Sequence, residues 1–139
     1  MTKFNFNGTE IFVNATFVES VNNVWGDNQW HNKFHVTMRT ANGKTAFTFY
    51  DSTHNYNAGK YELNADDLKG CIDCYLSDAS CYDCSRDFED FCNEMGYTSM
   101  SDYKRAKFAF NGCKRHYEGA IRLFGAEYYE IANAINESY

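Results

Sequence analysis

Residues 71–84 read Cys71-Ile-Asp-Cys74-Tyr-Leu-Ser-Asp-Ala-Ser-Cys81-Tyr-Asp-Cys84, and the fold that we expect is organised around them. This stretch holds four of the six cysteines of the chain, as two CxxC pairs separated by six residues. A structural zinc ion binds four thiolates at about 2.3 Å, and each CxxC pair brings two sulfurs close together. The sequence therefore predicts a closed, structural Zn²⁺ site formed by Cys71, Cys74, Cys81 and Cys84.

Three other roles for these cysteines remain open. Disulfide bonds require an oxidising compartment, and the beginning of the chain, Met-Thr-Lys-Phe-Asn-Phe, contains no apolar signal segment. A thioredoxin-like redox site places CxxC at the start of a helix after a parallel strand, and we do not find that pattern here. Inert buried thiols are the third possibility, although they do not require two equally spaced pairs.

Upstream of the cysteines, residues 1–60 have the alternating pattern of an antiparallel sheet. Asn7-Gly8 and Asn42-Gly43 are typical of tight hairpin turns, so we expect a meander of about four strands with one apolar face. The apolar face is expected to carry Phe4, Phe6, Ile11, Val13, Ala15, Phe17, Phe34, Val36, Met38, Phe47 and Phe49. The solvated face is expected to carry Asn14, Thr16, His35, Thr37, Arg39 and Thr48.

Both tryptophans, Trp25 and Trp30, fall in the polar segment between the two expected hairpins. Tryptophan in a loop is a favoured anchor for a binding partner. The alternative is that the two rings cover one end of the sheet core, and the sequence leaves both roles open.

Downstream, residues 61–139 are expected to be helical. Asn64 is a typical helix-capping residue before an apolar face that reaches Leu76, and we expect a loop from Ser77 to Cys84 to carry the second cysteine pair. Further helices are predicted at 86–95, 101–124 and 127–136, with Gly96 and Gly125 as stops. We thus predict a single α+β domain over 1–139: an antiparallel meander, then three to four helices, with the zinc at a helix-loop-helix corner.

The net charge of −6 and the pI of about 5.1 argue against general affinity for nucleic acid or an anionic membrane. No apolar run approaches the roughly 20 residues of a membrane span, so we expect a soluble, cytoplasmic protein. We also expect a monomer. Acidic residues are concentrated between Glu62 and Asp102, where only Lys69 and Arg86 oppose them. This pattern indicates either helix faces that pair with one another or an acidic surface that docks on a basic protein.

The segments Ser77-Asp-Ala-Ser80, Ser85-Arg-Asp-Phe-Glu-Asp-Phe-Cys-Asn-Glu-Met-Gly-Tyr97 and 101–125 resemble a family of small accessory proteins of bacteriophages and prophages. Those relatives commonly lack the paired cysteines. The chain as a whole is similar to phage-encoded type II-A anti-CRISPR proteins, and its four-cysteine cluster is similar to that of a metal-binding member. This resemblance implies a protein that binds Cas9 in the host bacterial cell and stops it from acting.

The resemblance and the charge pattern together predict a binding surface on Cas9's recognition lobe or nucleic-acid channel, where an acidic protein would prevent target DNA from loading. No direct contact with nucleic acid is expected. The candidate contact residues are Asp73, Asp78, Asp83, Asp87, Glu89 and Asp90, with Trp25 and Trp30 as apolar anchors.

Two other classes of function are open. A zinc-stabilised nucleic-acid binder would use the basic residues of the long helix, namely Lys104, Arg105, Lys107, Lys114 and Arg115. An enzyme is not expected, because none of the four histidines stands in a recognisable arrangement with Ser, Cys or carboxylates and no phosphate-binding glycine loop is present.

Overall fold

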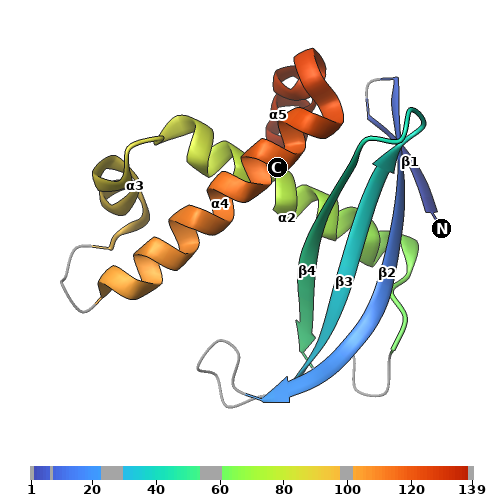
Figure 1. The fold of residues 1–139 in the computed structure, drawn as a ribbon, viewed down its shortest axis with the longest axis horizontal. Coiled ribbons are helices and arrows are strands. Elements are labelled where there is room, and N and C mark those ends of the chain that lie inside the picture. Colours follow the sequence, from blue (N-terminus) through green and yellow to red (C-terminus); the bar gives the residue numbers. More distant parts are fainter. Residues whose placement is uncertain (1, 7, 23–29, 54–60, 98–101, 138–139) are drawn as a thin grey trace. The chain divides into compact units, whose positions relative to one another are not determined.

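The computed structural model describes residues 2–6, 8–22, 30–53, 61–97 and 102–137 (Figure 1). The elements follow in the order β1 (Thr2–Phe6), β2 (Thr9–Asn22), β3 (Trp30–Thr40), β4 (Thr45–Thr53), α2 (Ala65–Cys84), α3 (Phe88–Met95), α4 (Tyr103–Phe124), η2 (Gly125–Glu127) and α5 (Tyr128–Glu137). Strands followed by helices confirm the predicted α+β class. Contacts divide the chain into two compact units, residues 1–72 (the sheet unit) and 73–139 (the helical unit).

The sheet is an antiparallel meander in the order β1-β2-β3-β4, as the two hairpin signals predict (Figure 1). At the second turn, the backbone amide of Thr40 donates to the carbonyl of Lys44 at 2.9 Å. Gly43 has φ = 84° there, in the left-handed region that favours glycine. The first turn contains Gly8 with φ = 91°, whereas Asn7 lies outside the described residues.

One face of the sheet is buried, and most of it matches the predicted apolar face. Ile11 and Val13 on β2 and Phe34, Val36 and Met38 on β3 are all buried. In an antiparallel pair, residues directly opposite each other lie on the same face, and the register places Ala46 opposite Met38. Ala46 and Thr48 therefore belong to the buried face of β4.

The prediction for Phe47, Phe49 and Thr48 is consequently wrong. Phe47 and Phe49 are 61% and 50% exposed and lie on the outer face of the sheet, whereas Thr48 is buried opposite Val36. The side-chain period of a strand is two, so the register of the β3–β4 hairpin decides which set of residues points inward. That register places Ala46 and Thr48 on the buried face.

Helix α2 begins as predicted but does not end where predicted. The Oδ1 atom of Asn64 accepts the amide of Asp67 at 2.8 Å, and the Oδ2 atom of Asp67 accepts the amide of Asn64 at 3.2 Å. This reciprocal pair is a capping box. The helix then continues to Cys84, so the predicted loop from Ser77 to Cys84 and the helix-loop-helix corner are wrong.

The reason for the longer helix is a buried stripe that continues past Leu76. Its members follow the i, i+3, i+4 spacing of a helix: Leu68, Cys71, Ile72, Tyr75, Leu76 and Ala79. No glycine or proline interrupts the chain from Cys71 to Cys84, so nothing in the local sequence ends the helix earlier. Burial of this stripe outweighs the weak preference of Ser and Asp for loops.

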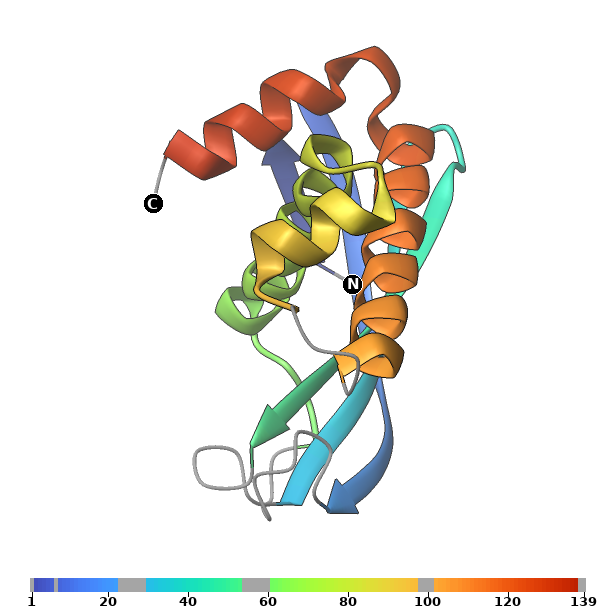
Figure 2. The same ribbon diagram turned by 90° about the vertical axis from the view of Figure 1, so that its left-hand side faces the viewer.

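The helical unit also contains α3, α4 and α5 (Figure 2). Gly96 ends α3 with φ = 80°, and Gly125 ends α4 at the residue that the sequence predicts. The short 3₁₀ turn η2 then leads directly from α4 into α5. Buried residues of this unit include Phe91 of α3, Leu123 and Phe124 of α4, and Tyr128 and Ile131 of α5.

Candidate functional site

The four cysteines of the predicted zinc site all lie on α2. A helix rises about 1.5 Å per residue, so Cys74 and Cys81 are about 10 Å apart along the axis, and Cys71 and Cys84 are about 20 Å apart. Two sulfurs bound to one zinc ion are separated by less than about 4.6 Å, twice the Zn–S bond length. Arranged in this way, the four thiols do not fit one zinc ion.

The residues that the structure describes contain no group of three or more His, Cys, Asp or Glu side chains that could hold a metal ion. A four-thiolate site would require α2 to open between Cys74 and Cys81. The zinc site thus stays a prediction from the sequence, and the metal content of the purified protein tests it.

Three thiols of the helical unit, those of Cys74, Cys81 and Cys113, have raised pKa values. Partial loss of solvent around the sulfur raises the pKa of Cys74, Cys81 and Cys113, and the negative charge of Asp78 raises each pKa further. For Cys113 the pKa reaches about 12. Thiolates are the nucleophilic and metal-binding form of cysteine, so these three side chains are poor nucleophiles near neutral pH.

Asp78 connects α2 to α4. Its Oδ2 atom lies 3.1 Å from Nδ1 of His116, and the His116 ring lies against the ring of Tyr75 with a centroid distance of 4.5 Å. The side chain of Asp78 is 48% exposed. Asp78 therefore contributes to packing within the helical unit and still presents part of its carboxylate to solvent.

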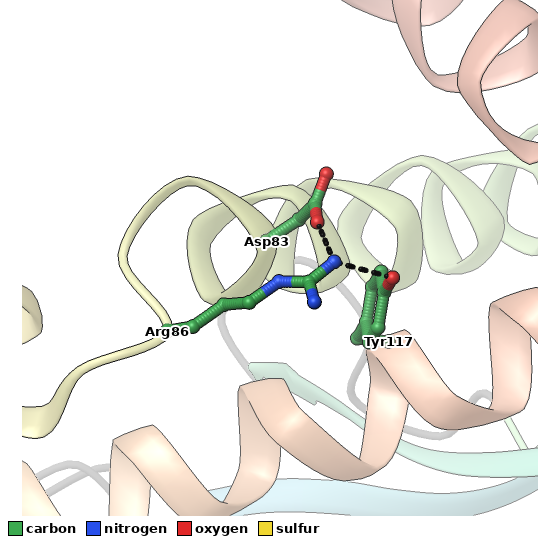
Figure 3. Close-up of polar contacts among 3 residues, drawn as sticks. All are labelled: Asp83, Arg86 and Tyr117. Atoms are coloured by element: carbon green, nitrogen blue, oxygen red, sulfur yellow. Dashed lines mark hydrogen bonds and ion pairs between the residues drawn. The ribbon is translucent and has the colours of Figure 1, made fainter.

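A second polar connection joins the end of α2 to α4 (Figure 3). The Nη2 atom of Arg86 lies 2.6 Å from Oδ1 of Asp83 and donates to the hydroxyl of Tyr117 at 2.7 Å. The guanidinium also stacks on the Tyr117 ring at 5.0 Å from its centroid. The pKa of Tyr117 is raised to about 12, mainly by a hydrogen bond with Tyr129 and to a smaller extent by partial burial. The carboxylate of Asp83 is thus engaged inside the unit.

The remaining predicted contact residues, Asp87, Glu89 and Asp90, lie at the start of α3. Together with Glu94, which was not a predicted contact, we define them as the acidic surface of α3. All four are exposed. The Oδ2 atom of Asp87 accepts the amide of Asp90 at 3.2 Å, so Asp87 is the N-cap of α3. Acidic residues in the first turn are favourable next to the positive end of the helix dipole, which explains why this short helix tolerates them.

The six predicted acidic contacts therefore fall into three groups. Asp87, Glu89 and Asp90 lie together on the acidic surface of α3. Asp78 and Asp83 bind His116 and Arg86 within the helical unit, and Asp73 is half-buried. Of the six, only the three in the first group are exposed residues.

Of the two tryptophans predicted as apolar anchors, the structure describes only Trp30. The expectation that Trp30 lies in a loop is wrong, because Trp30 is the first residue of β3; its side chain is 52% exposed. Trp25 lies outside the described residues.

Sequence reasoning missed the connections made by His116, Arg86 and Tyr117, because each depends on which helices face one another. It also missed the exposure of Phe47 and Phe49, which depends on strand register. The register pairs Phe49 with His35, which the sequence had assigned to the solvated face, but that pairing is known only from the structure.

No protein-family model, curated protein or solved structure matches this chain. Every helix in the described ranges is too short or too polar to cross a membrane.

Proposed function

We propose that this protein acts by stoichiometric binding to a basic surface of another protein, and that the partner is Cas9, which it inhibits. The observation that carries the proposal is the acidic surface of α3, where four exposed carboxylates occupy an element of eight residues and its cap. The choice of Cas9 rests on the resemblance of the chain to type II-A anti-CRISPR proteins.

The distribution of charge favours a binding role for the helical unit. Residues 73–139 contain 12 acidic and 7 basic residues, a net charge of −5, whereas residues 1–72 contain 7 acidic and 6 basic residues. Nearly all of the negative charge of the chain therefore belongs to the helical unit. A charged surface of one sign accelerates encounter with a partner surface of the opposite sign and selects against other partners.

The cations of the helical unit are partly committed to local contacts. Arg86 pairs with Asp83, and Arg105 pairs with Asp102 at 3.6 Å, three residues away in each case. The ammonium of Lys107 lies 4.4 Å from the centre of the Phe88 ring. These contacts leave the exposed carboxylates of Glu89 and Asp90 well placed for an external partner.

The inhibition that we propose is competitive occupation. Cas9 holds guide RNA and target DNA in positively charged channels. An acidic surface bound in such a channel, or on the neighbouring recognition lobe, would prevent the target from loading. No covalent step and no turnover is involved, so inhibition would require about one inhibitor for each Cas9 molecule.

Size-exclusion co-elution with Cas9, with and without guide RNA, tests this proposal. We expect a stable complex and loss of target cleavage when the protein is added before DNA. Failure to form a complex with type II-A Cas9 proteins, together with full cleavage, would rule Cas9 out as the partner.

A further inference from the structure

The outer face of the sheet carries aromatic rings and cations side by side. We define this outer face by the residues that pair across the strands on the side opposite to Val36. They include four rows: Lys3, Phe12, Arg39 and Thr45; Asn14, Thr37 and Phe47; Thr16, His35 and Phe49; and Glu19, Lys33 and Asp51. Asn5 with Glu10, and Val21 with His31, also pair on this side. Soluble proteins seldom expose large neighbouring aromatic rings without a function for them.

Three rings form the centre of this outer face. The His35 ring lies between Phe47 and Phe49, with centroid distances of 5.4 and 5.3 Å, and the two phenylalanine rings are 6.3 Å apart. Phe47 and Phe49 are both at least half exposed. Because these residues alternate along one strand, their rings follow each other at the two-residue repeat of a strand, about 6.8 Å.

Cations lie on either side of the rings. The ammonium of Lys33 is 4.6 Å from the centre of the Phe49 ring, and Arg39 is exposed two residues beyond Thr37. Lys3 lies in the same row as Arg39 and forms an ion pair with Glu10 at 3.4 Å. The acidic groups nearby are Glu10, Glu19 and Asp51, and burial raises the pKa of the Asp51 carboxyl.

We propose that this outer face binds single-stranded nucleic acid. Exposed aromatic rings on a sheet stack with unpaired bases, and flanking Lys and Arg side chains contact the phosphates. Phe47, His35 and Phe49 are the stacking rings, and Lys33 and Arg39 are the phosphate contacts. Double-stranded nucleic acid does not fit the same surface, because its bases are not available to stack on the rings.

This proposal departs from the expectation, based on net charge, that the protein makes no direct contact with nucleic acid. Net charge averages over the whole chain, and most of the negative charge belongs to the helical unit. The sheet unit has a net charge of only −1. The proposal is independent of Cas9 binding, because it uses different residues in a different unit.

Fluorescence anisotropy with labelled oligothymidylate and oligouridylate of about 20 nucleotides tests the proposal, since single-strand sites cover fewer nucleotides than this. We expect both strands to bind and the affinity to fall as salt rises. The corresponding duplex should bind at least tenfold more weakly than the single strands. A difference between the DNA and RNA probes would identify the natural strand.

The decisive variants alter the rings and leave the strand intact. Phe47→Thr/Phe49→Thr keeps residues that favour a strand and removes both rings, so we expect affinity to fall roughly tenfold or more. Phe47→Tyr/Phe49→Tyr keeps the rings and should bind as the native protein does. Phe108→Ala, on α4, removes the most exposed phenylalanine of the helical unit and serves as the matched control.

Three outcomes would overturn the proposal. The first is that the native protein fails to bind either strand at low salt. The second is that the threonine variant binds as well as the native protein. The third is that the duplex binds as tightly as the single strands. Loss of binding after Lys114→Gln/Arg115→Gln, with the threonine variant unaffected, would instead assign nucleic-acid binding to α4.

Discussion

Asp87 is the N-cap of α3 and also one of the four carboxylates of the acidic surface. Its side-chain oxygen accepts the amide of Asp90, and its charge is exposed to solvent. The two roles can be separated, because asparagine has the same capping oxygen without the charge.

We expect Asp87→Ala to lower the free energy of unfolding by about 1 kcal/mol, the usual effect of removing a capping side chain. Asp87→Asn should change it by no more than a few tenths of a kcal/mol. Urea unfolding followed by circular dichroism measures both. Equal destabilisation by the two variants would show that the charge, and not the cap, stabilises the start of α3.

Tyr75 is the residue whose titration best reports on the packing of the helical unit. Burial raises its pKa from 10.0 to about 12, although the charge of Arg122 acts in the opposite direction. The folded state then holds the phenolic proton more tightly than the unfolded chain does. This contribution to stability is complete below pH 10 and is lost as the pH rises through about 12.

Urea unfolding at a series of alkaline pH values should therefore show falling stability between about pH 10 and 12. Tyr75→Phe removes the titrating group and keeps the ring against His116, so the decline should be shallower. Tyr61→Phe, at an exposed tyrosine of the sheet unit, is the control for loss of a tyrosine hydroxyl. A native-like decline in Tyr75→Phe would contradict the burial of this hydroxyl.

At the scale of the elements, α2 is where the sequence was hardest to interpret. The two CxxC pairs indicated a metal site, and the helical spacing of Leu68, Ile72, Tyr75 and Leu76 indicated a helix. The metal site and the helix cannot both form over residues 77–84, and in the structure these residues are helical. The buried residue Ala79 extends the apolar stripe of the helix past Leu76. A single alanine, however, is a weak sequence signal that a helix continues.

The continuous helix makes a clear prediction about the cysteines. Cys74 and Cys84 are exposed, so Cys74→Ala and Cys84→Ala should each change the free energy of unfolding by less than about 0.5 kcal/mol. The purified protein should be analysed for zinc at the same time. One zinc per chain, lost in both variants together with a large fall in melting temperature, would contradict the helix and support the four-thiolate site.

Strand β4 shows a second limit of sequence reasoning. The sequence Thr45-Ala-Phe-Thr-Phe-Tyr alternates, and the larger residues of an alternating strand are normally assigned to the core. The register with β3 reverses that assignment, because Ala46 and Thr48 lie opposite Met38 and Val36. Hairpin position and turn residues were predictable from local chemistry, whereas the face that each side chain occupies depended on pairing across the turn.

At the scale of the whole molecule, charge and aromatic exposure are divided between the two units. The acidic surface of α3 belongs to the helical unit, and the exposed rings of Phe47 and Phe49 belong to the sheet unit. The first was predictable, because a run of acidic residues at 87–94 needs only a short helix to bring it together. The second required the strand register, and so it was not predictable from composition.

The carboxylates of α3 allow a charge-matched comparison. The triple variant Asp87→Asn/Glu89→Gln/Asp90→Asn removes three negative charges from the acidic surface and keeps the cap. The control, Glu62→Gln/Glu118→Gln/Glu130→Gln, removes the same number of charges from exposed positions elsewhere. A difference between these two proteins reports on the acidic surface and not on net charge.

The most direct test of the proposed function is a titration of Cas9 target cleavage with the native protein and both triple variants. We predict that the native protein and the control inhibit fully at about one molecule per Cas9, and that the α3 variant requires at least tenfold more. Equal inhibition by all three proteins would remove the acidic surface of α3 from the mechanism. Full cleavage in the presence of excess native protein would contradict Cas9 inhibition itself.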